Sequence, residues 1–248
     1  MKRPSKLNMN LIIDIGNTRV KSAVFEKNTI VNVFVFEKQK IISEIKKIIK
    51  EYEISDAIMS SVAKISDIKK AKIQNIVKVH QLSFATKVPF HNLYKTPKTL
   101  GVDRIALVSN AVLKFPNKNI LIIDAGTCIT FDFVNQKKQY LGGAISPGIE
   151  MRFQSLNTFT ATLPKVNPKI LDNFIGKSTE ESMNSGVVNG VIQEIEGVIH
   201  QYKTKYLDLT VVLTGGDTNF LSKQLKSSIF ANQNFLLEGL NEILTFNQ

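Results

Sequence analysis

The chain has 248 residues and a mass of 27.8 kDa, enough for one large domain or two small ones. Its 43% hydrophobic and 21% charged residues are typical of a globular protein, and no apolar run approaches the roughly 20 residues of a membrane helix. A single cysteine, Cys128, excludes an internal disulfide and fits a reducing compartment. We therefore expect a cytoplasmic protein with no membrane partner.

The net charge of +11 and the pI near 9.6 make nucleic-acid binding the first alternative to consider. Direct readout of bases favours the planar fork of arginine, whereas most basic residues here are lysines. The lysine excess indicates solvated helix faces, so no nucleic-acid partner is expected. Two arginines lie in turns with Gly and Asp, where we expect the fork to have a function. The four arginines are Arg3, Arg19, Arg104 and Arg152.

The first half of the chain predicts three strands followed by alternating helices and strands. Short apolar runs bounded by turn residues indicate strands, and apolar residues spaced by three and four indicate amphipathic helices. A long stretch with two prolines and no periodicity predicts a functional loop. In order, we expect strands over 11–16, 20–25 and 29–36, a helix over 39–52, a strand over 56–62, a short helix over 66–73 capped by Ser66, a strand over 77–82, the loop over 83–100 and a helix over 103–115.

The second half predicts the same plan. In order, we expect a hairpin over 119–134, a third strand over 140–145, a glycine-rich loop over 142–148 leading to a short helix around Met151, an irregular stretch over 158–176, a long helix over 187–202, a strand over 209–213, a turn over 214–217, a last strand over 229–235 and a closing helix over 236–246.

The two halves of the chain contain a sequence repeat. Leu11–Gly16 recurs, with a single substitution, as Leu121–Gly126, and each copy is followed by a Thr-containing turn and an alternating apolar run. Such a long-period repeat indicates a duplicated domain, with halves over 1–116 and 117–248. By analogy, three strands followed by helices and strands, twice over, predict the duplicated actin-like (ribonuclease H-like) α/β kinase fold, with an ATP cleft between the halves.

The first turn of the repeat carries groups that suit phosphate. Over 14–21 it offers a carboxylate, a glycine that lets the backbone approach a ligand, an amide, a hydroxyl and two cationic side chains. The carboxylate could hold a metal ion through water. One copy alone would be better explained as an ordinary hairpin turn, since Gly and Asn are common there. The second copy, over 124–130, favours the binding function.

A second chemical motif opens the helix over 103–115. Asp103 alone would be explained as a helix N-cap. A carboxylate and a guanidinium, Asp103 and Arg104, at a helix start after a long loop could instead form a substrate site. The residues by themselves leave both interpretations open.

Other familiar sites are not supported. The Gly176-Lys177-Ser178 sequence lacks the earlier glycine of a P-loop, because that position is Leu171. The glycines over 142–148 lack dinucleotide-binding spacing. The three histidines, His80, His91 and His200, have no metal-ligand spacing.

Four ordered motifs together resemble the type III pantothenate kinase family: Asp-x-Gly-Asn-Thr-x-x-Lys from Asp14, Gly-x-Asp-Arg from Gly101, Asp-x-Gly-Thr-x-x-Thr from Asp124, and Gly-Gly-x-Ile-x-Pro-Gly from Gly142. Each motif is weak alone, and the resemblance extends over 11–216. It implies ATP-dependent phosphorylation of pantothenate, the first step of coenzyme A biosynthesis.

The resemblance also implies roles for individual residues. Asp103 would be the general base, Mg²⁺ would lie near Asp14, and Asp124 would bind a monovalent cation, K⁺ or NH₄⁺. A homodimer is implied, with Thr179 contacting substrate across the interface, and the turn over 214–217 would cradle adenosine. The implied ATP-binding residues are Asp14, Ile15, Gly16, Asn17, Thr18, Arg19, Val20, Lys21 and Thr127, and the implied substrate-binding residues are Tyr94, Gly101, Val102, Asp103, Arg104 and Thr179.

Two alternatives remain at this point. One is a non-catalytic accessory protein of transcription from the same superfamily, which the basic charge would suit. The other is an actin-like kinase for a different small alcohol or acid. The three carboxylates Asp14, Asp103 and Asp124 favour an enzyme over the first alternative.

Overall fold

The computed structural model describes residues 9–63 and 66–248. The chain divides into two compact units. The first consists of the chain up to Lys114 together with Phe235–Gln248, and the second is Phe115–Asn234. In the described part, no helix is long and apolar enough to cross a membrane.

The first unit is built on a sheet of order β3-β2-β1-β4-β5. Its first three strands form the expected antiparallel meander, and β4 and β5 continue the sheet in parallel with β1. The central strand β1 is almost wholly buried, as its continuous apolar run predicts. The strands are β1 (Met9–Ile15), β2 (Val20–Glu26), β3 (Thr29–Phe36), β4 (Ile54–Ser61) and β5 (Val79–Gln81).

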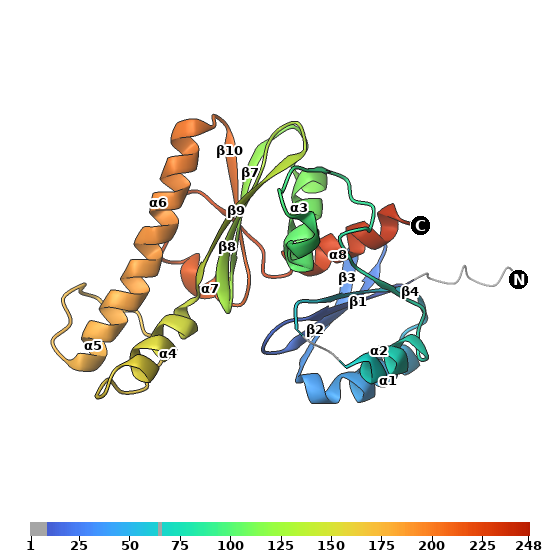
Figure 1. Ribbon diagram of the computed structural model, residues 1–248, viewed down its shortest axis with the longest axis horizontal. Coiled ribbons are helices and arrows are strands. Elements are labelled where there is room, and N and C mark those ends of the chain that lie inside the picture. Colours follow the sequence, from blue (N-terminus) through green and yellow to red (C-terminus); the bar gives the residue numbers. More distant parts are fainter. Residues whose placement is uncertain (1–8, 64–65) are drawn as a thin grey trace, which may run out of the picture. The chain divides into compact units, whose positions relative to one another are not determined.

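Helices α1 (Ile41–Glu51) and α2 (Asp67–Gln74) lie together beside one face of this sheet (Figure 1). A 3₁₀ turn, Lys38–Lys40, precedes α1, whose buried isoleucines pack in one cluster with Leu11, Ile13 and Ile15 of β1. The expected cap of α2 is confirmed, because the Ser66 hydroxyl accepts a hydrogen bond from the Lys69 amide. The odd-numbered residues of β1 therefore face α1, and the alternation of a strand turns Asn10, Ile12 and Asp14 to the other face.

Helices α3 (Val102–Lys114) and α8 (Phe235–Phe246) pack on each other and complete the first unit. On α8, Asn241 bonds to Asn10 of β1, so these helices cover the face to which Asp14 points. A Cβ on Gly239 would lie 2.1 Å from the Ala106 carbonyl oxygen, so only glycine lets the two helices approach this closely. The closing helix thus packs with the first unit, whereas the expected division assigned 117–248 to one half.

The loop before α3 is largely irregular, as expected, and contains only a two-residue strand, β6 (His91–Asn92), and a 3₁₀ turn, Pro97–Thr99.

The second unit repeats the plan of the first. The strands that belong to this unit have the order β11-β10-β7-β8-β9, in which β7 pairs antiparallel with β8 and parallel with β10. Strand β1 likewise has one antiparallel and one parallel neighbour. The sequence repeat therefore forms equivalent central strands in the two units, and the duplication is confirmed. The strands are β7 (Asn119–Ala125), β8 (Cys128–Val134), β9 (Gln139–Pro147), β10 (Leu209–Thr214) and β11 (Phe230–Ala231), and the helices are α4 (Ile149–Phe159), α5 (Thr179–Asn184), α6 (Gly190–Lys205) and α7 (Thr218–Leu221).

Three expectations for this unit were wrong in detail. The glycines over 142–148 do not start a loop, because β9 continues to Pro147 and a Cβ on Gly143 would lie only 1.6 Å from the Phe131 carbonyl oxygen. Glycine here serves a close approach of two strands. The helix around Met151 is a full three-turn helix, and the last strand shrinks to two residues. The long helix is confirmed, with a π-helical turn at Ser185–Asn189 before α6.

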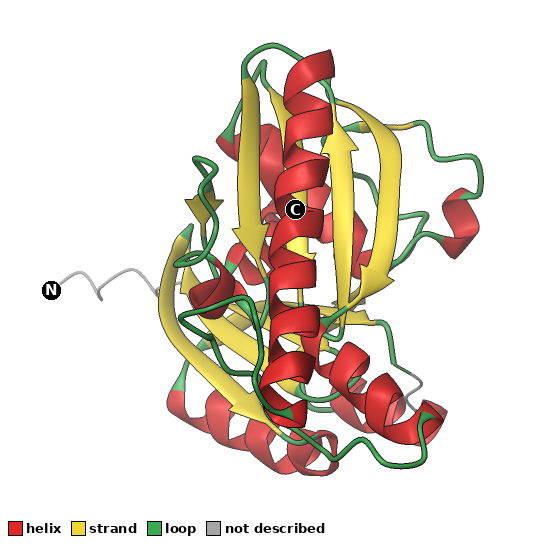
Figure 2. Cartoon of the chain, turned by 90° about the vertical axis from the view of Figure 1, so that its left-hand side faces the viewer, coloured by secondary structure: helices red, strands yellow, loops and turns green. Residues whose placement is uncertain are grey.

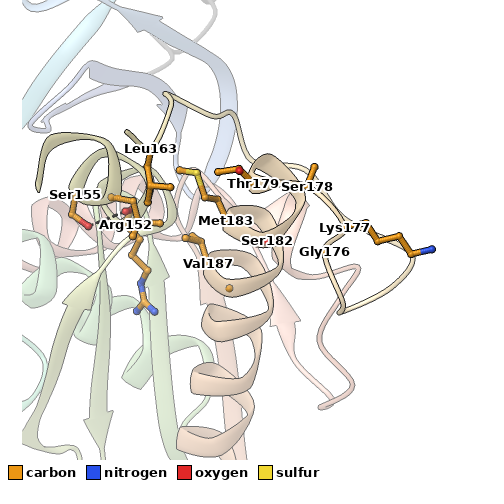
Figure 3. A pocket seen from close by; sticks show the side chains of 12 residues that line it. Arg152, Ser155, Leu163, Gly176, Lys177, Ser178, Thr179, Ser182, Met183 and Val187 are labelled. Carbon is orange, nitrogen blue, oxygen red and sulfur yellow. Dashed lines mark hydrogen bonds between the residues drawn. The ribbon is translucent and has the colours of Figure 1, made fainter. Parts of the chain in front are cut away.

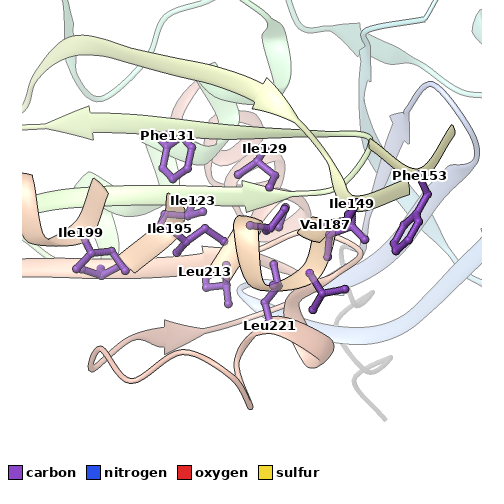
Figure 4. Packing of buried hydrophobic residues seen from close by; sticks show 14 of the residues in the cluster. Ile123, Ile129, Phe131, Ile149, Phe153, Val187, Ile195, Ile199, Leu213 and Leu221 are labelled. Atoms are coloured by element: carbon purple, nitrogen blue, oxygen red, sulfur yellow. The ribbon is translucent and has the colours of Figure 1, made fainter. Parts of the chain in front are cut away.

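Helix α6 lies along the strands of its sheet (Figures 1 and 2). Its apolar stripe, with Val191, Ile195 and Ile199 fully buried, packs against the face of the sheet that carries Ile123 and Phe131 (Figure 4). Burial of a full aliphatic side chain is worth about 1.5–3 kcal/mol. This packing fixes which residues of β7 face away from α6, and Asp124 is one of them.

Candidate active site

The site in the first unit begins at the end of β1. Asp14 is only 7% exposed, and the turn after it is closed by a hydrogen bond from the Gly16 amide to the Arg19 carbonyl. Asn17, Thr18 and Arg19 are exposed at the tip of this turn, with Lys21 half-buried opposite Asp14 in the β1–β2 ladder. The structure therefore places the predicted run in one hairpin that begins at a buried carboxylate: Asp14, Ile15, Gly16, Asn17, Thr18, Arg19, Val20 and Lys21.

Burial raises the pKa of Asp14 to about 6. The hydrogen bond from Ser60 lowers it, repulsion from Asp103 raises it, and Lys21 lowers it again. Asp103 is at the start of α3, which covers the face of the sheet to which Asp14 points. The two predicted carboxylates of the first unit are therefore close enough to repel each other. A cation bound between such groups would relieve both the burial and the repulsion.

Ser60 is a residue of this site that the sequence did not indicate. It is fully buried on β4, pairs with Asp14 in the parallel β1–β4 ladder, and donates a 2.7 Å hydrogen bond to Asp14 Oδ1. No motif marks it, because only the register of two strands far apart in sequence places its hydroxyl there. A signal was nevertheless present, because Ser60 directly follows the apolar run Ala57–Met59 of this strand.

Asp103 lies inside the first turn of α3 rather than at its N-cap, because the helix begins at Val102. Its Oδ1 accepts a 2.8 Å hydrogen bond from the Arg104 amide. The carboxylate lies over Gly101, where an added Cβ would come within 2.3 Å of Oδ1. The cap interpretation of Asp103 is therefore wrong. Glycine is found at position 101 because a side chain there would clash with the Asp103 carboxylate.

The steric fit predicts that Gly101→Ala displaces the Asp103 carboxylate. We expect turnover to fall by about 10²-fold, the range found when a catalytic group is misplaced by about 1 Å. The melting temperature should change little, because only the end of one side chain must move. Steady-state kinetics and thermal melting check this, with Gly197→Ala on α6, where a Cβ meets nothing within 4 Å, as control. Equal turnover in both variants would contradict the prediction.

Tyr94 and Arg104 also come together in the first unit. The Arg104 guanidinium carbon lies 5.6 Å from the centre of the Tyr94 ring, and Arg104 is 5% exposed. The Tyr94 amide donates to Asn92 Oδ1, which orders the loop on that side. At this distance the guanidinium and the ring make a cation–π contact, which orders both side chains. The predicted residues Tyr94, Gly101, Val102, Asp103 and Arg104 thus form one group at the start of α3.

In the second unit, three backbone segments meet at the end of β7. The turn over 124–127 follows the repeated strand, and Thr127 is exposed at its tip. A Cβ on Gly148 would lie 2.1 Å from the Gly126 carbonyl oxygen. A Cβ on Gly215, whose φ is +99°, would lie 2.2 Å from the Ala125 carbonyl and 2.5 Å from Asp124 Oδ1. The amides of Gly148 and Asp217 donate to the carbonyls of Thr127 and Ala125.

A cation at Asp124 would find suitable oxygens nearby. Thr130 is the register partner of Asp124 across the β7–β8 hairpin, so their side chains lie on the same face. Its Oγ1 is buried and makes no hydrogen bond within the part of the chain that the structure describes. No group of three acidic, His or Cys side chains suited to a metal ion occurs among the described residues. A monovalent ion held by hydroxyl, carboxylate and backbone oxygens fits this set.

Thr179 lies on another element of the second unit. It is the first residue of α5, capped by Ser178, and lines a cavity of about 930 Å³ between α4, α5 and the loop before α5 (Figure 3). Arg152, Lys177 and Met183 also line it. Its predicted contact with substrate stays a prediction.

Solved structures show the fold. A Campylobacter jejuni protein described as a Baf family transcriptional activator aligns with a TM-score of 0.62 and 21% identity, covering 96% of this chain and 98% of the other. A polyphosphate/ATP-glucomannokinase from Arthrobacter aligns with a TM-score of 0.51 and 12% identity, covering 96% and 99%. At these identities the likeness establishes the α/β fold shared with actin-like kinases, and nothing about activity.

Sequence relatives are more specific. The family profile described as type III pantothenate kinase matches residues 10–201. A type III pantothenate kinase from Christiangramia forsetii is 51% identical over 97% of this chain and 99% of its own length. One from Flavobacterium johnsoniae is 45% identical over 94% and 96%. The chain therefore belongs to the type III pantothenate kinase family, phosphotransferases that phosphorylate pantothenate in coenzyme A biosynthesis.

Proposed function

We propose that this chain transfers the γ-phosphoryl group of ATP to the primary hydroxyl of pantothenate, with Asp103 as general base. The hydroxyl oxygen forms a bond to phosphorus, ADP leaves, and Asp103 accepts the hydroxyl proton. The observation that carries this assignment is the placement of Asp103: a half-buried carboxylate held over Gly101 and close enough to Asp14 to repel it. A carboxylate in that position can accept a proton during attack.

The exposed polar groups of the two repeated turns are the proposed phosphate ligands. The backbone and side chains of 15–19, with Lys21, would bind phosphate oxygens in the first unit, and Thr127 would do so in the second. Phosphoryl transfer has a loose transition state, so positioning and charge neutralisation supply most of the catalysis. The use of both turns by one ATP rests on the duplication and on the family, and it stays a prediction.

Asp14 is the residue that would hold Mg²⁺, directly or through water. A bound Mg²⁺ would neutralise charge on the phosphate oxygens. The fit is supported by the buried carboxylate of Asp14, whose charged form is destabilised by burial and by Asp103. The hydrogen bond from Ser60 would keep one oxygen oriented while the other remains for the ion.

The proposed monovalent-cation site predicts a salt dependence. Asp124 would repel ATP phosphates, and a cation held by Asp124 and Thr130 would offset that repulsion. We expect good activity in K⁺ or NH₄⁺ and weak activity in Na⁺ alone at the same ionic strength. Thr130→Val, which removes only the buried hydroxyl, should weaken the response to K⁺. Equal rates in all three salts would contradict the site.

Pantothenate is the proposed ligand of the Tyr94–Arg104 group, with Arg104 available for its carboxylate. We also propose a homodimer in which Thr179 contacts the substrate of the other copy. Large apolar side chains exposed near α5 support an interface there: Phe159 is 84% exposed and Phe174 is 75% exposed. The cytoplasmic location expected from the single cysteine stays a prediction.

One experiment tests the function. Purified protein is incubated with ATP, Mg²⁺, K⁺ and a panel of small alcohols and acids that includes pantothenate, and the products are identified by mass spectrometry. Phosphopantothenate is the expected product. If another acceptor is phosphorylated and pantothenate is not, the protein is still a kinase, but the proposed substrate is wrong. No turnover of any acceptor would favour the non-catalytic alternative.

A further inference from the structure

The side chain of Arg152 contacts three different partners, and none of the four family motifs includes this residue. It lies on the first turn of α4, and its amide donates to the Gly148 carbonyl. Its Nε donates to the Pro147 carbonyl at 2.9 Å, and its Nη2 donates to Ser146 Oγ at 3.0 Å and pairs with Glu194 of α6. The guanidinium thus ties the last two residues of β9 to a helix that is itself anchored in the core.

The residues that Arg152 holds lie directly against the turn over 124–127. Ser146 and Pro147 are the register partners of Ile129 and Cys128, at the end of the β8–β9 ladder that adjoins this turn. The next residue, Gly148, donates its amide to the Thr127 carbonyl at 3.1 Å. An added Cβ there would come within 2.1 Å of the Gly126 carbonyl oxygen and 2.6 Å of the Thr127 carbonyl oxygen. Backbone atoms are therefore in contact, with no side chain between them to absorb a shift.

From these contacts we infer that Arg152 is a positioning residue for the nucleotide-binding turn. The path runs from Glu194 through the guanidinium to Ser146 and Pro147, then through Gly148 to the backbone of Gly126 and Thr127. Arginine is needed because three acceptors are engaged at once by a rigid planar fork. A lysine ammonium could pair with Glu194 but could not reproduce the fixed directions toward Ser146 and Pro147.

The inference rests on the proposed role of Thr127 in binding ATP, and it makes a selective prediction. A turn that loses its support should bind nucleotide less well, while the pantothenate group of the first unit should be unaffected. Arg152→Lys is expected to raise the KM for ATP and its Kd by about tenfold, which corresponds to about 1.4 kcal/mol of binding free energy. The KM for pantothenate should rise much less than the KM for ATP, because Arg152 approaches a proposed pantothenate contact only through the cavity that it lines together with Thr179.

Two further variants make the test independent of whether Arg152→Lys folds. Ser146→Ala removes one acceptor of the guanidinium and should give a smaller rise in the KM for ATP. The matched control is Glu196→Gln, on the same helix as Glu194, where the carboxylate accepts bonds from Lys226 and Ser227 and does not contact the turn. This control should lower the melting temperature without changing the KM for ATP.

The measurements are steady-state kinetics in both substrates, ATP binding by calorimetry and thermal melting. A rise in the KM and Kd for ATP alone supports the inference. Unchanged ATP affinity, or parallel losses in both substrates together with a lower melting temperature, would overturn it and leave Arg152 a purely structural residue. If the wild-type protein binds ATP but does not phosphorylate pantothenate, the proposed substrate fails, while the ATP-binding comparison still decides the role of Arg152.

Discussion

Asp103→Asn is expected to abolish most turnover while leaving the fold intact. Asparagine keeps an oxygen that can accept the hydrogen bond from the Arg104 amide, and its shape fits over Gly101. Loss of a negative charge near the start of α3 costs about 0.3–1 kcal/mol, or a few degrees in melting temperature for a chain of this size, and loss of the repulsion with Asp14 acts in the opposite direction. Asparagine cannot accept a proton, and removal of a general base costs about 10²–10⁴-fold in rate.

The control for this substitution is Asp67→Asn. Asp67 is also an acidic residue in the first turn of a helix, α2, and its loss should have a similarly small effect on stability with no effect on turnover. Binding of ATP should persist in Asp103→Asn, and the pKa of Asp14 should fall, because repulsion from Asp103 is one of the causes that raise it. Near-native turnover in this variant would rule out Asp103 as the base.

Asp14→Asn is expected to lower the activity of the protein and to raise its stability. The variant should lose most of its Mg²⁺-dependent turnover, because the amide cannot replace a carboxylate toward a cation. It should also be more stable than the wild-type protein at neutral pH. The pKa of Asp14 rises on folding from 3.8 to about 6, so the ionised side chain costs the folded state up to about 3 kcal/mol.

The sign of this effect gives a pH profile. Below pH 3.8 the carboxyl is protonated in both the folded and the unfolded chain, and the two proteins should be equally stable. Between pH 3.8 and about 6 the unfolded chain ionises first, so wild-type stability falls relative to the variant. Above about pH 6 the difference should be constant. Chemical denaturation across pH 4–8 measures it, and a variant that is less stable than wild type at pH 8 would contradict the burial argument.

Asp56→Asn is the control for Asp14→Asn. Asp56 lies on β4, where it pairs with Asn10 toward the opposite end of the β1–β4 ladder that joins Asp14 to Ser60. The same chemical change there should leave turnover unchanged. A loss of activity in both variants would show that the ladder, rather than the Asp14 carboxylate, was being tested.

The sequence alone determined the duplicated strand–turn–strand plan and the residues that follow each repeated strand. Apolar runs such as those over 11–13 and 121–123 report burial directly, because a central parallel strand is covered on both faces. The four motifs could also be recognised, since the residues of each are close in sequence. For the same reason, the carboxylate turns were predicted at the ends of β1 and β7, where the structure has them.

Only the tertiary structure decided which residues support those turns. Ser60 reaches Asp14 through strand register, Gly148 meets Gly126 by backbone contact, and Arg152 acts from a helix whose length the sequence underestimated. The closing helix joins the first unit because Gly239 fits against Ala106 and Asn241 bonds to Asn10, contacts between residues far apart in the chain. Local periodicity reports which face of an element is buried, but the partner of that face depends on long-range packing, which no window of the sequence contains.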